Sequence, residues 1–396
     1  MTTAIDYPAL LARHVATSPR RMTPELFPYD FAVGNPPPEA LPLQELIEAT
    51  ARALDREGRD LAQYLAAEGY LGLRQVIADK MARHERVTVT PEQIIVGNGS
   101  LQLIAMLIDC FIDPGDTVIV EAFTYVGTLR LLRRARARLV GIPVDEEGMR
   151  TDCLAETLHA LQQQGIRPKF IYTLTNFHNP LGVDLSAARK RQLLQLATTY
   201  GVPIIEDDVY GDLRMEGDTP PSMLAMDTAG SVVWLGTFSK ILAAGVRLGW
   251  AVVPPALFPY LIDHKLDSAT NTFASLVVAE YLRGRLDERV QEVVAVYRSK
   301  RDALLAALER HFAGRATWTR PKGGMFLWLT LADGTDTEAA LEQARRAGVN
   351  YYPGVAFSAM GDSGRNSLRL AYGYPPLSAI EEGVARLAEV LATPSH

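Results

Sequence analysis

The sequence predicts an α/β fold, in which a large domain has a mostly parallel central sheet between helices and a smaller α+β domain follows at the C-terminal end. Between about residues 89 and 253, short apolar runs alternate with helical stretches, which is the pattern of a parallel sheet covered on both faces. Beyond about residue 257 the alternation stops and a long helical stretch appears. The length of 396 residues also suggests two or three structural units.

The first elements in chain order are an arm and a helix. Residues 1–42 are predicted to form an extended N-terminal arm that contributes to the small domain, because "GNPPPEALP" is rich in proline, and "LQELIEATARAL" predicts an amphipathic helix. The strands predicted next are "QIIVGNG", "TVIVEA", "RLVGIPV", "KFIYTLTN", "VPIIEDD", "SVVWLGT" and "RLGWAVV". The helices predicted between them are "SLQLIAMLIDCFI", "YVGTLRLLRRARA", "CLAETLHALQQQ" and "SAARKRQLLQLATTYG".

The C-terminal part does not continue the alternation of strands and helices. The helix "SLVVAEYLRG" leads into a long helix from about Asp287 to His311. The segments "WTRPKGGMFLWLTL" and "NSLRLAYG", separated by a helix, precede a final helix. We therefore predict a large domain over residues 43–275 and a small C-terminal domain over residues 276–396.

Bulk composition excludes several classes of protein. The formal net charge is −6, which does not favour a nucleic-acid partner, and the basic run "RLLRRARAR" has the helical spacing of a solvated helix face. Two cysteines are too few for a disulfide framework, and no CxxC spacing indicates a metal site. The sequence contains no recognisable signal peptide and no apolar run long enough to cross a membrane. We expect a cytoplasmic protein without a metal.

Polar side chains and glycines follow the predicted strands. Ligands of an open parallel sheet bind beyond the carboxyl ends of its strands. The residues found there are Gly97, Asn98, Gly99, Ser100, Tyr125, Asn179, Asp207, Asp208, Tyr210, Thr237, Ser239, Lys240 and Arg247. Each alone has an ordinary structural explanation: an aspartate capping a turn, a tyrosine in the core, a lysine exposed in a loop. Their shared position at one edge of one sheet favours a single ligand site instead.

The chemistry of this set is specific. A lysine amine forms a Schiff base with a carbonyl, and hydroxyls, an arginine and a helix N-terminus hold a phosphate. A buried aspartate keeps a pyridine nitrogen protonated, while a tyrosine and an asparagine can hydrogen-bond a phenolic oxygen. Together these groups describe a site for pyridoxal 5′-phosphate (PLP). A dinucleotide site is disfavoured, because the GxGxxG pattern would require glycine at Gln102.

Several motifs resemble those of the class I and II aminotransferases of PLP fold type I, over nearly the whole chain. The strongest is "TFSK" followed by "GVRLGW", and the others are "QYLAAEGYLGLR", "NFHNPLG", "EDDVYGDL", "PKGGMFLWL", "PGVAF" and "LRLAYG". The sequence is most similar to the aminoadipate, kynurenine and aromatic aminotransferase branch. The resemblance implies the aspartate aminotransferase-like fold and a homodimer with active sites at its interface.

The resemblance also implies a role for each matching residue. Lys240 would form the aldimine with PLP and carry the proton, with Asp207 at the pyridine nitrogen and Tyr210 and Asn179 at the ring hydroxyl. Tyr125 would stack on the ring, and Arg369 would bind the substrate α-carboxylate near Gly34. The phosphate would be held by Gly99, Ser100, Leu101, Thr237, Ser239, Arg247 and, from the neighbouring subunit, Tyr64.

Some positions depart from the family pattern. Leu101 stands where glutamine is common, Leu181 replaces a threonine, His178 precedes Asn179, and "AAG" replaces the usual A/S-P-G after the lysine. None of these changes removes a catalytic group. Two interpretations of His178 remain open: it makes a structural hydrogen bond in a loop, or it contributes to the substrate pocket.

The favoured function is therefore a ping-pong aminotransferase of amino-acid metabolism, with a role in biosynthesis, that exchanges an amino group between an L-amino acid and a 2-oxo acid. An elimination, replacement, cyclisation or oxidase-type PLP reaction remains an alternative. A PLP-binding domain of a transcription regulator is disfavoured, because the family pattern begins within the first few dozen residues. Aromatic, aminoadipate-like and branched side chains all remain open, and residues 263–273 together with the arm are expected to choose among them.

Overall fold

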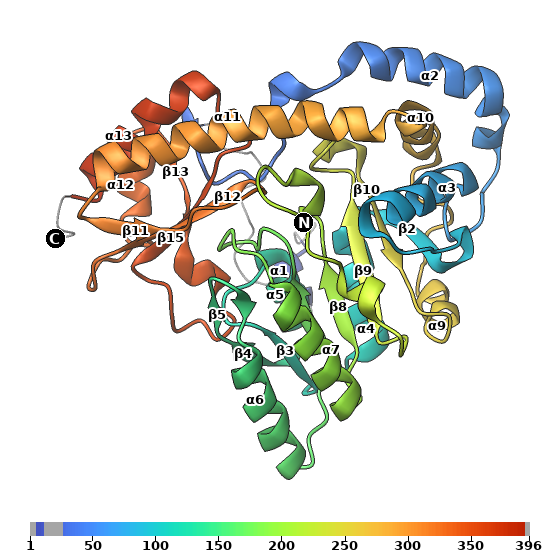
Figure 1. Ribbon diagram of the computed structural model, residues 1–396, viewed down its shortest axis with the longest axis horizontal. Helices are drawn as coiled ribbons and strands as arrows, with labels where there is room; N and C mark the ends of the chain where they lie inside the picture. Colours follow the sequence, from blue (N-terminus) through green and yellow to red (C-terminus); the bar gives the residue numbers. More distant parts are fainter. Residues whose placement is uncertain (1–4, 12–26, 393–396) are drawn as a thin grey trace.

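A computed structural model describes residues 5–11 and 27–392 of the chain. Its largest element is a seven-stranded sheet with the strand order β2-β10-β9-β8-β7-β3-β4 (Figure 1). Only β10 runs against its neighbours β2 and β9, so the expected mostly parallel sheet is confirmed. The strands are β2 (Ile94–Asn98), β3 (Thr117–Glu121), β4 (Arg138–Ile142), β7 (Ile171–Leu174), β8 (Ile204–Asp207), β9 (Val232–Thr237) and β10 (Leu248–Val252).

Helices cover both faces of this sheet, because alternate residues of a strand point to opposite sides. On β3, Ile119 packs with the residues of α6 and α7, whereas Val118 and Val120 belong to the core shared with α4 and α5. The helices of this part are α2 (Leu43–Glu57), α3 (Leu71–Lys80), α4 (Ser100–Phe111), α5 (Val126–Arg134), α6 (Thr151–Gln163), α7 (Ala187–Tyr200), α8 (Met223–Met226), α9 (Phe258–Asp263) and α10 (Thr272–Leu282).

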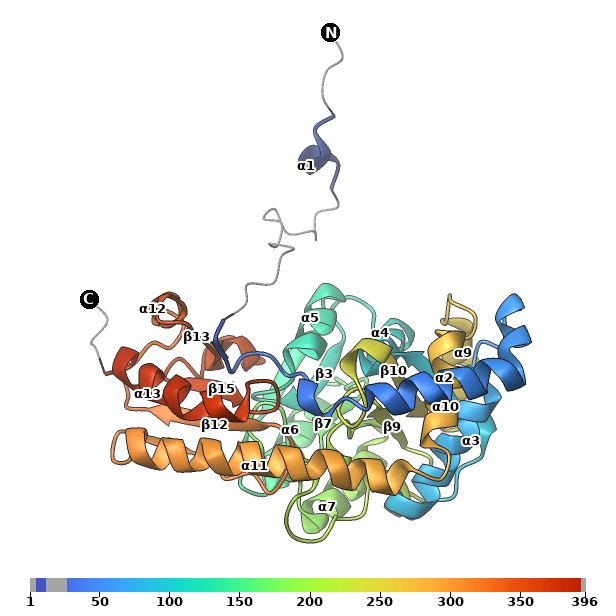
Figure 2. The same ribbon diagram turned by 90° about the horizontal axis from the view of Figure 1, so that it is seen from above.

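A second sheet lies beside the first and has the order β11-β12-β15-β14, with all pairs antiparallel. Its strands are β11 (Ala316–Trp318), β12 (Phe326–Leu331), β14 (Tyr352–Pro353) and β15 (Ser367–Ala371), and α12 (Leu341–Arg346) and α13 (Ile380–Val390) accompany it. The long helix α11 (Leu286–Phe312) runs past both sheets (Figures 1 and 2). Packing along α11 thus joins the α/β and α+β parts of the chain.

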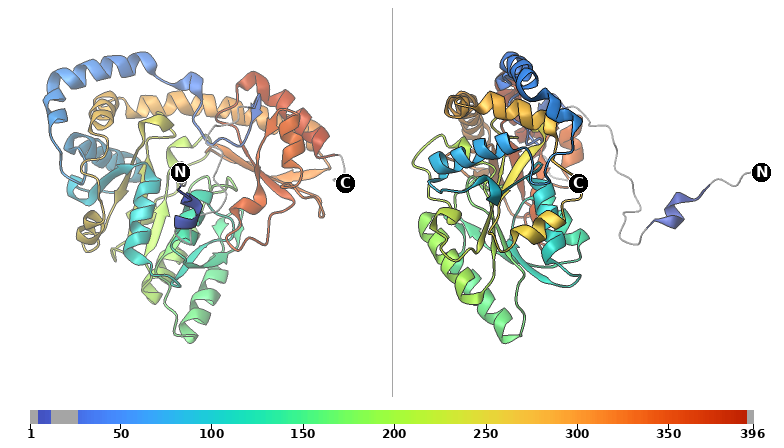
Figure 3. Two further views of the ribbon diagram at one scale, coloured as in Figure 1. Left: turned by 180° about the vertical axis from the view of Figure 1, so that it is seen from behind. Right: turned by 90° about the vertical axis from the view of Figure 1, so that its right-hand side faces the viewer.

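The described N-terminal residues contain two short regular elements. Residues 1–4 and 12–26 of the predicted arm lie outside the described residues. The described part contains the short helix α1 (Tyr7–Leu10) and the strand β1 (Tyr29–Asp30), which pairs in parallel with β13 (Val349–Asn350) of the C-terminal part. Figure 3 shows the chain crossing from the C-terminal part to the start of α2. The domain boundaries at residues 42 and 275 stay predictions.

One short hairpin was not predicted. The hairpin of β5 (Val144–Asp145) and β6 (Gly148–Met149) has strands of two residues each, which is too short for a periodic pattern.

Within the described ranges, no helix is both long and apolar enough to cross a bilayer.

Candidate active site

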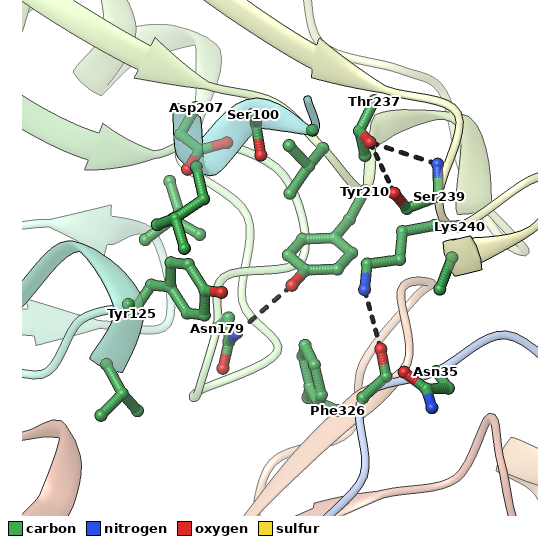
Figure 4. A pocket seen from close by; sticks show the side chains of 18 of the residues that line it. Asn35, Ser100, Tyr125, Asn179, Asp207, Tyr210, Thr237, Ser239, Lys240 and Phe326 are labelled. Carbon is green, nitrogen blue, oxygen red and sulfur yellow. Dashed lines mark hydrogen bonds between the residues drawn. The ribbon is translucent and has the colours of Figure 1, made fainter. Parts of the chain in front are cut away.

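A cavity of about 400 Å³ opens beyond the carboxyl ends of the parallel strands, between the two sheets. Figure 4 shows Asp207, Tyr125, Tyr210 and Lys240 around the same hollow. Of the residues predicted for the site, those that line the cavity are Gly34, Gly99, Ser100, Leu101, Tyr125, Asn179, Asp207, Tyr210, Thr237, Ser239, Lys240, Arg247 and Arg369. The structure therefore brings together residues that the sequence places up to 335 positions apart, from Gly34 to Arg369.

Tyr64 is the exception among the predicted residues. Its side chain is 94% exposed and does not line the cavity of its own chain. Within one chain, Tyr64 therefore lies outside the site.

One end of the cavity brings together groups that can bind an anion. Gly99 is the N-cap of α4 and has φ of +73°, so the backbone N–H groups of the first helical turn begin directly at the cavity. A Cβ atom on Gly99 would lie 2.5 Å from Nη2 of Arg247, so a larger residue here would displace that guanidinium. Thr237 Oγ1 lies 2.9 Å from Ser239 Oγ at the same end. Helix N–H groups, two hydroxyls and a guanidinium together suit a phosphate dianion.

Arg247 is held toward this end by unusual backbone geometry. Its φ of +53° lies in the left-handed region, which is uncommon for a residue with a side chain. Its Nη2 donates to the carbonyl oxygen of Asn98 at 3.2 Å, so the guanidinium reaches across from the loop before β10 to the end of β2. Strained backbone of this kind persists where the surrounding structure fixes it, often at a binding site.

Lys240 lies in the loop after β9, and its amine points into the cavity (Figure 4). Nζ donates a hydrogen bond of 2.7 Å to the carbonyl oxygen of Gly34. Burial, with the guanidinium groups of Arg369 and Arg247 nearby, lowers the pKa of Lys240 to about 8. An amine with this pKa is a far better nucleophile and base near neutral pH than an exposed lysine.

Asp207 ends β8 and is 2% exposed. Burial raises its pKa to about 7, and the hydroxyl of Tyr172, which donates to Oδ2 at 2.5 Å, opposes that rise. Oδ1 has no hydrogen-bond partner among the described residues. A buried carboxylate oxygen without a donor is costly, and a protonated ring nitrogen in the cavity would supply one.

Asn179 connects the middle of the cavity to the small sheet. Its Nδ2 donates to the hydroxyl of Tyr210 at 3.2 Å, and its Oδ1 accepts from Nη1 of Arg369 at 3.0 Å. Nη2 of Arg369 donates to the carbonyl oxygen of Ala32. These bonds fix the guanidinium of Arg369, which comes from β15, beside the cavity.

Aromatic rings surround Arg369 and were not singled out in the sequence. Its guanidinium carbon lies 4.2 Å from the ring centroid of Phe326, 5.2 Å from that of Tyr352 and 5.1 Å from that of Phe357. Burial lowers the pKa of Arg369 to about 10, which still leaves it charged at neutral pH. The rings make the guanidinium rigid and partly dry, and this strengthens its pairing with a carboxylate.

Other lining residues were also missed. Asn35, Phe326, Tyr352 and Arg130 line the cavity, although Arg130 belongs to the basic run that was interpreted as a solvated helix face. The segment 263–273, which was expected to shape the substrate pocket, contributes no residue to the lining within one chain. The "GNPPP" motif was a usable signal for Asn35, whereas aromatic residues in apolar strands resemble core.

His178 and Leu181, the two residues near Asn179 that depart from the family pattern, are buried outside the cavity lining. His178 is 1% exposed, does not line the cavity, and its Nε2 lies 3.3 Å from Oε2 of the buried Glu121. Leu181 packs with Trp328 and Phe357. Asp208, the neighbour of Asp207, accepts a hydrogen bond from Asn176 and faces away from the lining. None of the three touches the space in which a ligand would lie.

Comparison with known proteins shows what this arrangement resembles. The family model "Aminotransferase class I and II" matches residues 29–387. An aromatic-amino-acid aminotransferase of Thermococcus litoralis is 38% identical over 91% of this chain and 87% of its own length. The crystal structure of a multiple substrate aminotransferase from Thermococcus profundus superposes with a TM-score of 0.91 at 34% identity, covering 98% of each chain.

A third comparison concerns the cofactor. The α-aminoadipate aminotransferase LysN from Thermus thermophilus, solved with N-(5′-phosphopyridoxyl)-L-leucine, superposes with a TM-score of 0.86 at 35% identity over 92% of both chains. The ligand in that structure joins an amino acid to the phosphopyridoxyl group. A phosphate, a pyridine ring and an α-carboxylate are the three groups for which the present cavity has matching partners.

Proposed function

The chain belongs to the class I and II aminotransferases, and we propose that its cavity holds PLP against Lys240 and the α-carboxylate of the substrate against Arg369. Membership of this family makes the protein a PLP-dependent transferase that exchanges an amino group between an amino acid and a 2-oxo acid. The observation that carries the assignment of residues is the convergence of Lys240, Asp207 and Arg369 on one cavity.

The residues present fit the cofactor. The N-terminus of α4, Thr237, Ser239 and Arg247 would hold the phosphate, and Oδ1 of Asp207, which lacks a donor among the described residues, would accept the pyridine N–H. Asn179 and Tyr210 would meet the ring hydroxyl, and Tyr125 would lie against the ring. PLP supplies an electron-withdrawing ring that stabilises negative charge at the substrate Cα.

Lys240 then has two tasks that its environment supports. As a largely desolvated amine with a pKa of about 8, it attacks a carbonyl carbon more readily than an exposed lysine does. When Nζ is free, it can take the proton from the substrate Cα and deliver it elsewhere in the same cavity. The carbonyl oxygen of Gly34 accepts a hydrogen bond from Nζ and would hold the free amine in the cavity.

Arg369 and the N-terminal segment would bind the substrate. Two guanidinium N–H groups can pair with a carboxylate, as arginine commonly does. In the present structure these groups contact Asn179 and Ala32, so substrate binding would exchange at least one of these bonds. An amino acid and a 2-oxo acid would use the same position in turn, which gives ping-pong kinetics.

The assembly and cellular setting are part of the proposal. A homodimer in which Tyr64 reaches the phosphate of the other subunit explains why this tyrosine is 94% exposed in one chain. Both cysteines are free thiols, which suits a cytoplasmic enzyme. A role in amino-acid biosynthesis fits the reaction. We also propose the domain division at residues 42 and 275.

An absorption spectrum of the purified protein tests the function. Yellow protein that bleaches with one amino acid of a panel, and recovers with a 2-oxo acid, is the expected result and identifies the donor. The variant Lys240→Ala should lose the protein-bound yellow colour and the turnover, whereas Lys322→Ala, which removes an exposed lysine outside this cavity, should keep both. Protein that takes up no PLP, or retains its colour in Lys240→Ala, would contradict the site.

A further inference from the structure

The two oxygens of the Asp207 carboxylate have different surroundings. Oδ2 accepts a hydrogen bond from the hydroxyl of Tyr172 at 2.5 Å, whereas Oδ1 has no hydrogen-bond partner among the described residues. Asp207 lines the cavity and Tyr172 does not. The carboxylate is therefore anchored from the protein side and offers its second oxygen to the cavity.

Strand pairing fixes this geometry. Tyr172 lies on β7 and Asp207 on β8, and in the parallel register Leu174 is opposite Asp207. Tyr172 and Leu174 are two residues apart on one strand, so their side chains leave the same face of the sheet as that of Asp207. The tyrosine thus reaches the aspartate diagonally across two strands in the middle of the sheet, where Tyr172 is 0% exposed.

The hydroxyl of Tyr172 stabilises the charged form of the carboxylate. Burial favours a neutral Asp207, and Asp208 and Glu121 add negative charge that raises its pKa further, whereas Tyr172 and Lys240 lower it. Glu121 is itself held by hydrogen bonds from Thr173 and from the backbone N–H of Leu174, and it donates none to Asp207. Tyr172 is the direct hydrogen-bond donor to Asp207 among the described side chains.

We propose that Tyr172 is a positioning residue for the cofactor: its hydroxyl keeps the Asp207 carboxylate ionised and turns Oδ1 toward the pyridine nitrogen. This inference rests on the proposed function. The aspartate and the ring nitrogen share one proton, and the position of that proton depends on which partner is the stronger base. Loss of the tyrosine hydroxyl makes the carboxylate more basic, so the proton moves from the nitrogen toward the carboxylate. The ring then withdraws electrons less strongly.

The variant Tyr172→Phe removes the hydroxyl and keeps the ring in the core. The direct measurement is the ¹⁵N NMR shift of the pyridine nitrogen in protein loaded with ¹⁵N-labelled PLP. We expect this shift to move toward that of the unprotonated ring, kcat to fall about tenfold and KM for the amino acid to change less than about twofold, in line with the loss of one hydrogen bond to a charged group.

Tyr351→Phe is the matched control. Tyr351 is 1% exposed and donates its hydroxyl to the carbonyl oxygen of Thr337, outside the cavity. This variant also loses one buried hydrogen bond, so its stability should fall by a similar amount while its ¹⁵N shift and kcat stay those of the parent protein. If Tyr172→Phe does not fold, a fluorinated tyrosine at the same position, a stronger donor, should shift the nitrogen in the opposite direction.

The outcomes separate this inference from the proposed function. An unprotonated pyridine nitrogen in the parent protein, or no bound PLP, would overturn the assignment of Asp207 and with it the proposed site. A protonated nitrogen in the parent that keeps the same shift in Tyr172→Phe, or in the fluorinated protein, would overturn the role of Tyr172 alone. A shift that changes equally in Tyr351→Phe would also overturn it, since a general loss of stability would then be the cause.

Discussion

The amine of Lys240 donates a hydrogen bond of 2.7 Å to the carbonyl oxygen of Gly34, a residue 206 positions earlier in the chain. Arg369 makes a similar bond to Ala32. The segment that precedes α2 therefore contacts both the residue proposed to bind PLP and the residue proposed to bind the substrate carboxylate. Because this segment also pairs through β1 with β13 of the C-terminal part, it connects the position of that part to both groups.

The lowered pKa of Lys240 predicts how fast protein without cofactor captures PLP. Only the neutral amine attacks a carbonyl, and burial beside Arg369 and Arg247 disfavours its charged form. A pKa of about 8 in place of 10.5 gives roughly 300-fold more neutral amine at pH 7. The capture rate, followed by stopped-flow absorbance, should therefore rise with pH and reach half its maximum near pH 8.

Two comparisons make this measurement specific. Methylamine and PLP mixed under the same conditions correct for the titration of PLP itself. A midpoint near the value of an ordinary lysine would show that Lys240 is exposed to water in solution, contrary to its position in the cavity.

Arg369→Ala should separate substrate binding from cofactor binding. Removal of a guanidinium that pairs with a carboxylate in a partly dry site costs about 3 kcal/mol, so KM for the amino acid should rise about 100-fold. Bound PLP, measured by its absorbance, should remain. Arg365→Ala removes an exposed arginine two residues before β15, which pairs with Asp336, and should leave both quantities unchanged. Release of PLP from Arg369→Ala would mean that this arginine serves the cofactor.

Gly99→Ala should weaken the binding of PLP at its phosphate. The new Cβ would lie 2.5 Å from Nη2 of Arg247, and φ of +73° is unfavourable for alanine. We expect the Kd of PLP, from fluorescence titration, to rise at least about tenfold as the guanidinium moves away. Gly165→Ala has nearly the same φ, +70°, with no atom within 4 Å of its Cβ, and so measures the backbone cost alone. Equal effects of the two variants on Kd would contradict the proposal that Gly99 and Arg247 hold the phosphate.

Part of the cavity lining could be grouped from the sequence because the strongest motif is local. Thr237, Ser239, Lys240 and Arg247 lie within one short stretch after β9, so their shared place at a strand end was readable without the fold. The central sheet was equally readable from its continuous apolar strands, and their boundaries differ from the observed ones by only a few residues.

What the sequence did not reveal depends on contacts between distant segments. Tyr172 stands in an apolar strand, and nothing in its neighbours shows that its hydroxyl meets a carboxylate 35 positions away. Phe326 and Tyr352 resemble core for the same reason, although their rings flank Arg369. The role of His178 was open between a structural contact and the substrate pocket. Its ring in fact lies between the buried Glu121 and the backbone N–H of Leu181, which donates to Nδ1.

Tyr64 provides the test of the dimer. In the proposed assembly each cavity combines Lys240 of one subunit with Tyr64 of the other, as two-fold symmetry allows. The single variants Lys240→Ala and Tyr64→Ala should each impair the enzyme, the first by loss of the amine and the second by weaker binding of PLP. A mixed dimer then has one cavity with both changes and one cavity with neither.

Mixing the two variants should therefore restore activity. With random exchange of subunits, half of the dimers are mixed, so roughly a quarter of all cavities regain the parent composition. Activity at limiting PLP should approach that fraction of the parent value, and it should appear only at concentrations at which subunits exchange. If Tyr64 served the cavity of its own chain instead, the mixed dimer would carry one change in each cavity, and mixing would restore nothing. An absence of recovery in freely exchanging subunits would therefore rule out the shared site.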